Sequence, residues 1–185
     1  MTRLRTSQII AFFALTALMI GLAGLSRLLP HPPNFAPIAA IALFAASLTR
    51  SSAAGFAIAA LALIVSDAAI GFYDWRVMAA VYFAYALPAL LGRGVTPDRI
   101  APVRTGVFAL AASVSFFLVT NFAVWAFGGL YPITAAGLGA AYTNALPFFK
   151  YTLAGDLFWT AALFGAWAGL RRILPERAPC AYRRI

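Results

Sequence analysis

The chain has 185 residues, of which 63% are hydrophobic and only 10% are charged, and its formal net charge is +9. This composition excludes a water-soluble domain, which needs far more polar surface, and indicates an integral membrane protein. The single cysteine, Cys180, excludes an internal disulfide and a multi-cysteine metal site. The basic residues lie almost entirely outside the apolar runs, so we interpret them as membrane topology and expect no nucleic-acid partner.

Six apolar segments follow one another, and we expect each to be a helix of one transmembrane domain covering residues 1–185. They are 8–29, 36–48, 53–72, 77–92, 105–128 and 152–174. A helix needs about 20 residues to cross the hydrocarbon, so we expect the second and fourth to be shielded by protein or to cross only partly. Because five more spans follow the first, we expect that one to be a retained helix and not a signal peptide.

Two of the connecting segments have unusual compositions. Pro30, Pro32 and Pro33 follow the first span, and they prevent that helix from continuing. A stiff, extended loop of this kind can cover a cavity as a lid with little ordering cost when a ligand binds. The segment 130–151 is too long for a simple turn, and we expect it to hold a short helix near 136–146 that lies at the surface or dips inward.

The distribution of Lys and Arg predicts how the chain is oriented in the membrane. If the N-terminus is cytoplasmic, eleven of the 14 basic residues fall in inner segments and three, Arg27, Arg76 and Lys150, fall in outer ones. This asymmetry follows the positive-inside rule and requires an even number of spans. We therefore expect both termini in the cytoplasm, and the proline loop on the outer side of a bacterial inner (cytoplasmic) membrane.

Polar and aromatic residues gather in the outer segments and in the outer halves of the spans, which indicates a binding site at that end. An ionisable group inside a membrane helix is costly and usually faces a cavity or a partner. Two buried acids, Asp67 and Asp156, fall in this category. The alternative is a purely architectural pairing of Asp67 with Arg76 and of Asp156 with Lys150, and an interfacial aromatic belt would equally explain Trp75.

Motifs for several chemistries are absent from the sequence. There is no Walker sequence for ATP hydrolysis, no HExxH or GxSxG motif, and one histidine cannot form a histidine-rich metal site. We therefore expect no enzyme activity, no catalytic cofactor and no resident metal.

Four stretches, spread over about residues 26–166, resemble a known family. They are "RLLPHPPNFAPIAAIALFAAS", "IVSDAAIGFYDWRVMAAVYFAYALPALLG", "VTNFAVWAFGGLYPITAAGLGAAYTNALPFF" and "AGDLFWTAALFG". The chain resembles the substrate-binding (S) components of energy-coupling-factor (ECF) vitamin transporters, and within them the BtuM-type proteins proposed to take up vitamin B12. The resemblance implies an all-α, six-helix transmembrane bundle, with a cavity that opens outward beneath the loop after the first helix.

The resemblance also implies roles for particular residues. It places Asp67 and Tyr85 in the site, with His31 and Asn34 in the loop that covers it. The cysteine that ligates the corrinoid cobalt in BtuM-type proteins is absent, and Ala79 and Ala80 stand in that region, with Ala80 the closer match. Together with the polar residues of the outer segments, the expected substrate-binding set is His31, Asn34, Asp67, Trp75, Arg76, Tyr85, Asn121, Tyr131, Tyr142 and Asn144.

The sequence thus predicts a membrane transporter that binds cobalamin, or a related corrinoid, and moves it inward without a covalent step. One alternative is an S component for another vitamin that works with a shared ATPase module. Small residues of the first span, Ala14, Ala17 and Gly21, would suit docking on such a module, although packing within the monomer explains them equally well. Two further hypotheses are a membrane enzyme that modifies a corrinoid or lipid and a purely structural membrane subunit.

Overall fold

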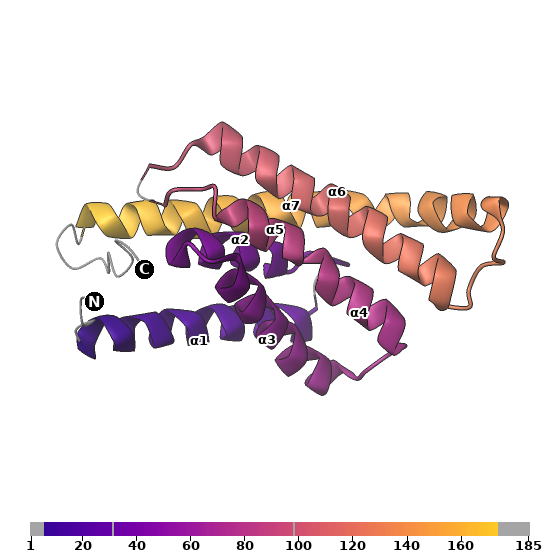
Figure 1. Ribbon diagram of the computed structural model, residues 1–185, viewed down its shortest axis with the longest axis horizontal. Helices are drawn as coiled ribbons and strands as arrows, with labels where there is room; N and C mark the ends of the chain where they lie inside the picture. Colours follow the sequence, from indigo (N-terminus) through magenta and orange to yellow (C-terminus); the bar gives the residue numbers. More distant parts are fainter. Residues whose placement is uncertain (1–5, 31, 98, 174–185) are drawn as a thin grey trace.

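The computed structural model describes residues 6–30, 32–97 and 99–173, and this part of the chain is all-helical, with no strand. The helices are α1 (Thr6–Leu28), α2 (Ile38–Thr49), α3 (Ser52–Ile70), α4 (Trp75–Ala84), α5 (Ala86–Gly92), α6 (Pro102–Phe127) and α7 (Ala135–Ile173) (Figure 1). The all-α class predicted from the sequence is confirmed.

Four helical segments are long and apolar enough to cross a membrane, so the chain is a multi-pass membrane protein. They are Ser52–Ile70, Trp75–Gly92, Pro102–Phe127 and Ala135–Arg172, and two shorter apolar helices accompany them, Phe12–Leu28 and Ile38–Thr49. Together these six segments correspond to the six predicted spans.

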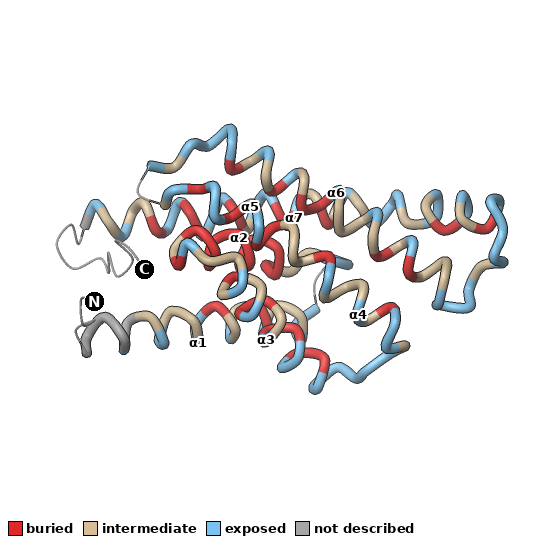
Figure 2. The backbone as a smooth tube through the Cα atoms, viewed as in Figure 1, coloured by how far each residue is buried: buried red, intermediate tan, exposed pale blue. Residues whose placement is uncertain are grey.

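The short helix α2 lies at the centre of the bundle, where the buried part of the backbone is concentrated (Figure 2). All of its residues except Leu48 are buried, which confirms that protein shields the second span. Glycines on two neighbouring helices allow this close approach. A Cβ added at Gly55 of α3 would lie 2.6 Å from the Ala42 carbonyl oxygen, and one at Gly92 would lie 2.3 Å from the Leu43 carbonyl oxygen. Their backbones therefore pack directly against α2.

The fourth span is interrupted at Tyr85, which separates α4 from α5. Pro88 cannot donate a backbone hydrogen bond to the carbonyl of Ala84, and its ring crowds that turn, so a regular helix cannot continue there. Instead the Tyr85 amide donates to the Tyr82 carbonyl, at 3.1 Å. The two pieces together cover Trp75–Gly92, slightly longer than the predicted 77–92, and by length and composition this segment could cross a membrane.

Helix α7 corrects the prediction for the last third of the chain. We expected a separate short helix near 136–146 followed by a span from 152, but one 39-residue helix runs through both regions and includes Pro147. Contacts with α6 hold its first half in place. The Phe117 ring lies 4.8 Å from that of Phe149, and the Tyr142 hydroxyl donates to the Leu118 carbonyl. Tertiary packing therefore outweighs the helix-breaking tendency of the proline.

The helices alternate in direction, so the first described turn of α1 and the last turn of α7 lie at the same end of the molecule (Figure 1). The connection 50–51 and the described residues 93–97 and 99–101 of the next connection on this side lie at this end, which we call the basic end. Residues 29–30 with 32–37, 71–74 and 128–134 connect the opposite ends of the helices, and we call this side the loop end; the tip 128–134 extends well beyond the other two connections (Figure 1). This arrangement agrees with the even number of spans. Which end faces the cytoplasm stays a prediction from the positive-inside rule.

Candidate functional site

An ion pair inside the bundle joins α1 to α3. The Nη2 atom of Arg27 lies 2.6 Å from the Oδ1 atom of Asp67, and the exposed fractions of the two side chains are 20% and 2%. Arg27 also donates through Nη1 to the hydroxyl of Ser66, the residue before Asp67. The predicted pairing of Asp67 with Arg76 was therefore wrong. Helices α1 and α3 pack along each other, which brings Arg27, one residue from the end of α1, beside the last turns of α3.

Two tyrosines extend this pair toward α4. The hydroxyl of Tyr82 donates to the second carboxylate oxygen of Asp67, at 2.8 Å. Tyr73 lies in the loop between α3 and α4, where partial burial, and secondarily the negative charge of Asp67, raise the pKa of its hydroxyl. The carboxylate thus contacts groups from two other helices, α1 and α4. These contacts fix its position and compensate the desolvation cost of burying its charge.

A second buried acid lies farther across the bundle. Asp156 of α7 is buried, and the hydroxyl of Ser113 on α6 lies 2.7 Å from its Oδ2 atom. The predicted pairing of Asp156 with Lys150 was wrong, because the Lys150 ammonium lies over the Tyr151 ring. Tyr85, at the break between α4 and α5, lies within electrostatic range of Asp156, and also of the ion pair described above. The Tyr85 ring packs against that of Phe116 on α6, with the ring centroids 5.3 Å apart.

These groups form two hydrogen-bonded clusters, Arg27–Ser66–Asp67–Tyr82 and Ser113–Asp156, with Tyr85 within electrostatic range of both acids, and we call them together the polar network. Its members are Arg27, Ser66, Asp67, Tyr82, Tyr85, Ser113 and Asp156, from α1, α3, α4, the α4–α5 break, α6 and α7. Two residues of the predicted set, Asp67 and Tyr85, belong to it.

The proline loop, of which the structure describes residues 29–30 and 32–37, reaches α7. Its Phe35 packs on α7, where the carbonyl oxygen of this residue accepts a hydrogen bond from the indole of Trp159, at 3.3 Å. The Phe35 ring lies 5.7 Å from that of Phe158, and a Cβ added at Gly155 would lie 3.0 Å from the Phe35 Cα. The absence of a side chain at Gly155 therefore allows the loop to lie close against α7.

Two predicted site residues belong to this loop. Asn34 is exposed and has a positive φ of 61°, a conformation that asparagine tolerates better than most residues. His31 lies outside the described residues.

Trp75 and Arg76 are exposed at the start of α4. The Asp74 carboxylate caps this helix by accepting from the backbone amides of Arg76 and Val77, and it also forms an ion pair with Arg76 at 3.0 Å. The hydrogen bond from the guanidinium holds the pKa of Asp74 below its usual value. The same guanidinium lies 5.2 Å from the ring centroid of Phe127, so the start of α4 meets the end of α6.

The four remaining predicted residues lie on the hairpin that α6 and α7 form, and their polar groups bond within it. Asn121 donates to the Phe117 carbonyl at 2.8 Å, and Tyr142 donates to the Leu118 carbonyl at the same distance. The amide of Asn144 donates to the Tyr131 hydroxyl at 3.3 Å. The structure thus distributes the described members of the predicted set over several helices and loops. None of these hydrogen bonds links the hairpin residues to the polar network.

With this geometry in place, the comparison with known families gives one result. Residues 7–177 match the model of a family described as a family of unknown function, DUF6580. The chain belongs to the DUF6580 family. No curated protein and no solved structure matches it significantly.

The sequence-based prediction missed part of the network in this DUF6580 chain. Arg27 was counted as a loop cation, and Ser66, Tyr82 and Ser113 were not included in the site. The sequence does hold a signal for the ion pair. Arg27 interrupts the first apolar run and Asp67 interrupts the third, and two opposite charges within membrane helices of one bundle tend to pair.

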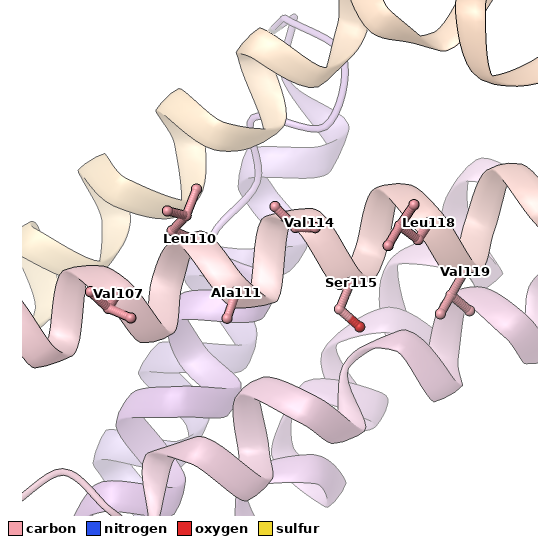
Figure 3. A pocket seen from close by; sticks show the side chains of 7 residues that line it. All are labelled: Val107, Leu110, Ala111, Val114, Ser115, Leu118 and Val119. Carbon is pink, nitrogen blue, oxygen red and sulfur yellow. The ribbon is translucent and has the colours of Figure 1, made fainter.

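Two apolar hollows lie away from the polar network of the DUF6580 chain. The larger, about 460 Å³, follows the surface of α6 and is lined by that helix alone, as Figure 3 shows. Several of its residues are strongly exposed, among them Val107, Val114 and Leu118, as expected of a face that meets lipid chains. The second, about 360 Å³, lies between α6 and α7 near Thr105 and Thr160. Among the described residues, no group of three His, Cys, Asp or Glu side chains could hold a metal ion.

Proposed function

We propose that this DUF6580 protein is a membrane transporter that binds cobalamin, or a related corrinoid, at the loop end and releases it on the other side. The observation that supports this most strongly is the pairing of Arg27, Asp67 and Tyr82 from three helices inside an apolar bundle. Placing such groups in a membrane is costly, and where it occurs it usually marks a substrate path. The resemblance to ECF S components, which covers most of the chain, supplies the ligand class.

The chemistry of the loop end suits a large ligand with a flat ring and peripheral amides. Trp75 offers an exposed aromatic face, and Asn34 and Arg76 offer an amide and a cation at the same end of the fold. Phe35 holds the proline loop against α7. In the proposed transporter, movement of this loop away from α7 would open access to the polar network, and its return would close it. Release then requires reorientation of the protein or displacement of the loop, with no covalent step.

An S component for another vitamin, working with a shared ATPase module, is the second candidate. One specific observation favours a partner in the membrane. Ala14, Ala17 and Gly21 lie along α1 and all three are exposed, so packing within the monomer does not account for these small residues. Small residues on an exposed helix face let another transmembrane helix approach closely.

The absorbance spectrum of the protein purified in mild detergent tests the main proposal, because a bound corrinoid is coloured. We expect cyanocobalamin to stay with the protein through gel filtration in about a one-to-one ratio. The exposed variant Trp75→Ala should weaken retention, and Trp167→Phe, at a buried tryptophan of the basic end, is the aromatic control. A protein that releases all cyanocobalamin, or co-purifies with an ATPase module and a different small molecule, would contradict the corrinoid assignment.

A further inference from the structure

Asp156 is the one described acid of a membrane-spanning helix that lacks a cationic partner. It lies near the middle of α7 and is only 4% exposed, and neither ion pair in the described part of the chain includes it. The side chain that bonds to it is a neutral hydroxyl, that of Ser113, which is itself fully buried. A permanently ionised carboxylate in this position would carry a large uncompensated desolvation cost.

The elements packed against this part of α7 bring few ionisable groups to Asp156. Helix α2, which packs against α7, has no titratable side chain. The described cation of α6, Arg104, lies nine residues before Ser113 and stacks on the Phe108 ring. Tyr85, at the α4–α5 break, lies within electrostatic range of Asp156.

The remaining nearby groups do not supply a counter-charge in the described structure. Arg27 of α1 is already paired with Asp67. On α7 itself, Lys150 and Tyr151 lie more than one turn before Asp156, with the Lys150 ammonium over the Tyr151 ring. The titratable residue of loop 29–37, His31, lies outside the described residues.

The Ser113 hydroxyl has two acceptors within reach but only one hydrogen. Its Oγ atom lies 2.7 Å from Asp156 Oδ2 and 3.1 Å from the carbonyl oxygen of Ala109, one turn earlier on α6. A hydroxyl donates a single hydrogen bond and can accept others. When Asp156 is ionised, Ser113 donates to the carboxylate. When Asp156 carries a proton, the carboxyl donates to Ser113 Oγ, and the Ser113 hydrogen turns to the Ala109 carbonyl.

We propose that Asp156 and Ser113 form a reversible proton-binding site in the membrane core, in which one proton is taken up by the carboxylate and the Ser113 hydroxyl reverses its direction. In both protonation states the Ser113 hydroxyl and the Asp156 carboxyl group remain hydrogen-bonded to each other, and no heavy atom has to move. The proton bound at this α6–α7 contact is the one that would couple a proton gradient to transport. That coupling rests on the function proposed above, whereas the proton site does not.

Infrared difference spectroscopy of the full chain in lipid nanodiscs tests the site without a substrate. The sequence has only five Asp and Glu residues, so the carboxyl region of the spectrum is simple. Between about pH 5 and pH 9 we expect a protonated-carboxyl band that loses intensity as the pH rises. The band should be missing in Asp156→Asn, which keeps the shape of the side chain, and shifted in frequency in Ser113→Ala. Asp74→Asn, at an exposed helix cap, is the matched control and should keep the band.

Two results would overturn the proton site. One is the absence of any carboxyl band that depends on Asp156, which would mean that this group stays ionised. The other is a band that depends on Asp156 but is constant over the whole pH range, which would mean that it stays neutral.

Uptake of radiolabelled cyanocobalamin into proteoliposomes then tests the coupling. An imposed pH gradient, acidic on the loop side, should increase uptake by the wild type and leave uptake by Asp156→Asn at its gradient-free level. Equal uptake by the wild type with and without the pH gradient would refute the coupling. If the wild type takes up no cyanocobalamin at all, with or without a gradient, the proposed function fails and the spectroscopic result on the proton site still stands.

Discussion

The guanidinium of Arg27 and the carboxylate of Asp67 lie 2.6 Å apart. Arg27 also contacts Ser66, which lies 39 positions further along the chain and directly precedes Asp67. Arg27 and Asp67 are each the charged interruption of an otherwise apolar helix, and each neutralises the other. The pair therefore links α1 to the rest of the bundle at the loop end.

Removal of one member of this pair should destabilise the protein strongly. We expect Arg27→Met to lower the free energy of unfolding by about 3–5 kcal/mol, because it leaves the Asp67 carboxylate buried and uncompensated. SDS-induced unfolding in mixed micelles measures the change. Arg76→Met removes an ion pair whose side chains are 47% and 33% exposed, and should cost clearly less than Arg27→Met, because solvent screens the exposed pair. Equal losses in the two variants would show that Arg27 and Asp67 do not form a buried pair.

The all-helical class and the alternating course of the apolar segments were predictable, whereas the partners of the buried charges were not. Long apolar runs and basic connections are local signals, so they can be read from one sequence. Asp67 pairs with Arg27 and not with Arg76 because α1 packs along α3. This packing joins distant parts of the chain, so no local sequence pattern indicates it. The same holds for Ser113 and Asp156, on different helices.

Local signals also misled us where tertiary contacts oppose them. Pro147, Asn144 and Lys150 interrupt the hydropathy of the segment 130–151, so a separate short helix was expected there. The aromatic contact between Phe117 and Phe149 instead stabilises one continuous helix against α6.

Substitution of two glycines, one in a crowded position and one in an open position, tests the packing around α2. Gly55→Ala places a methyl group 2.6 Å from both the Ala42 carbonyl oxygen and the Ala46 Cβ, and should destabilise the protein by about 1–3 kcal/mol. At Gly106, on α6, an added Cβ meets nothing within 4 Å. Gly106→Ala should therefore be neutral or stabilising by up to about 1 kcal/mol, since alanine favours helix more than glycine does. Thermal unfolding in detergent compares the two, and a stabilising Gly55→Ala would argue against direct backbone packing.

Docking of the proline loop on α7 should depend on the lack of a side chain at Gly155. We expect Gly155→Val to push Phe35 away and to shift the fluorescence emission of Trp159 to longer wavelength, because the indole loses its bond to the Phe35 carbonyl. Gly139→Val, on the same helix but with open space around the added Cβ, controls for the cost of valine in a helix. An unchanged emission spectrum in both variants would mean that the loop does not rest on this surface.

The start of α4 should lose stability in acid through Asp74. The pKa of Asp74 is lowered in the folded protein, chiefly by the hydrogen bond from Arg76. Its contribution to stability is therefore fully present above the pKa that the group has in the unfolded chain, and it is lost as the pH falls through the lower pKa of the folded protein. The difference in unfolding temperature between the wild type and Asp74→Asn should therefore shrink as the pH falls below about 4. A difference that stays constant from neutral pH to about pH 3 would contradict this role of the carboxylate.

A thiol introduced on α4 would test the corrinoid proposal directly. Ala80 is half-buried on this helix, whereas its neighbour Ala79 is exposed. If cobalamin binds as proposed, Ala80→Cys should provide a thiolate ligand for the cobalt and change the visible spectrum of the bound corrinoid. Ala79→Cys carries the same thiol on the exposed side and should leave the spectrum unaltered. Identical spectra for the wild type and both variants would place the corrin ring away from this part of α4.

Helix α7 is much longer than the membrane is thick. Its 39 residues extend roughly 58 Å at 1.5 Å per residue, about twice the hydrocarbon thickness, and a tilt of about 20° shortens this projection only slightly. Arg171 and Arg172 occupy its last turn, where cationic side chains favour the headgroup region. We therefore expect the surplus length to emerge at the opposite surface, with the tip of the hairpin, residues 128–134, outside the acyl chains. An antibody fragment raised against that tip would reach it in intact membranes, and would report which compartment the tip enters.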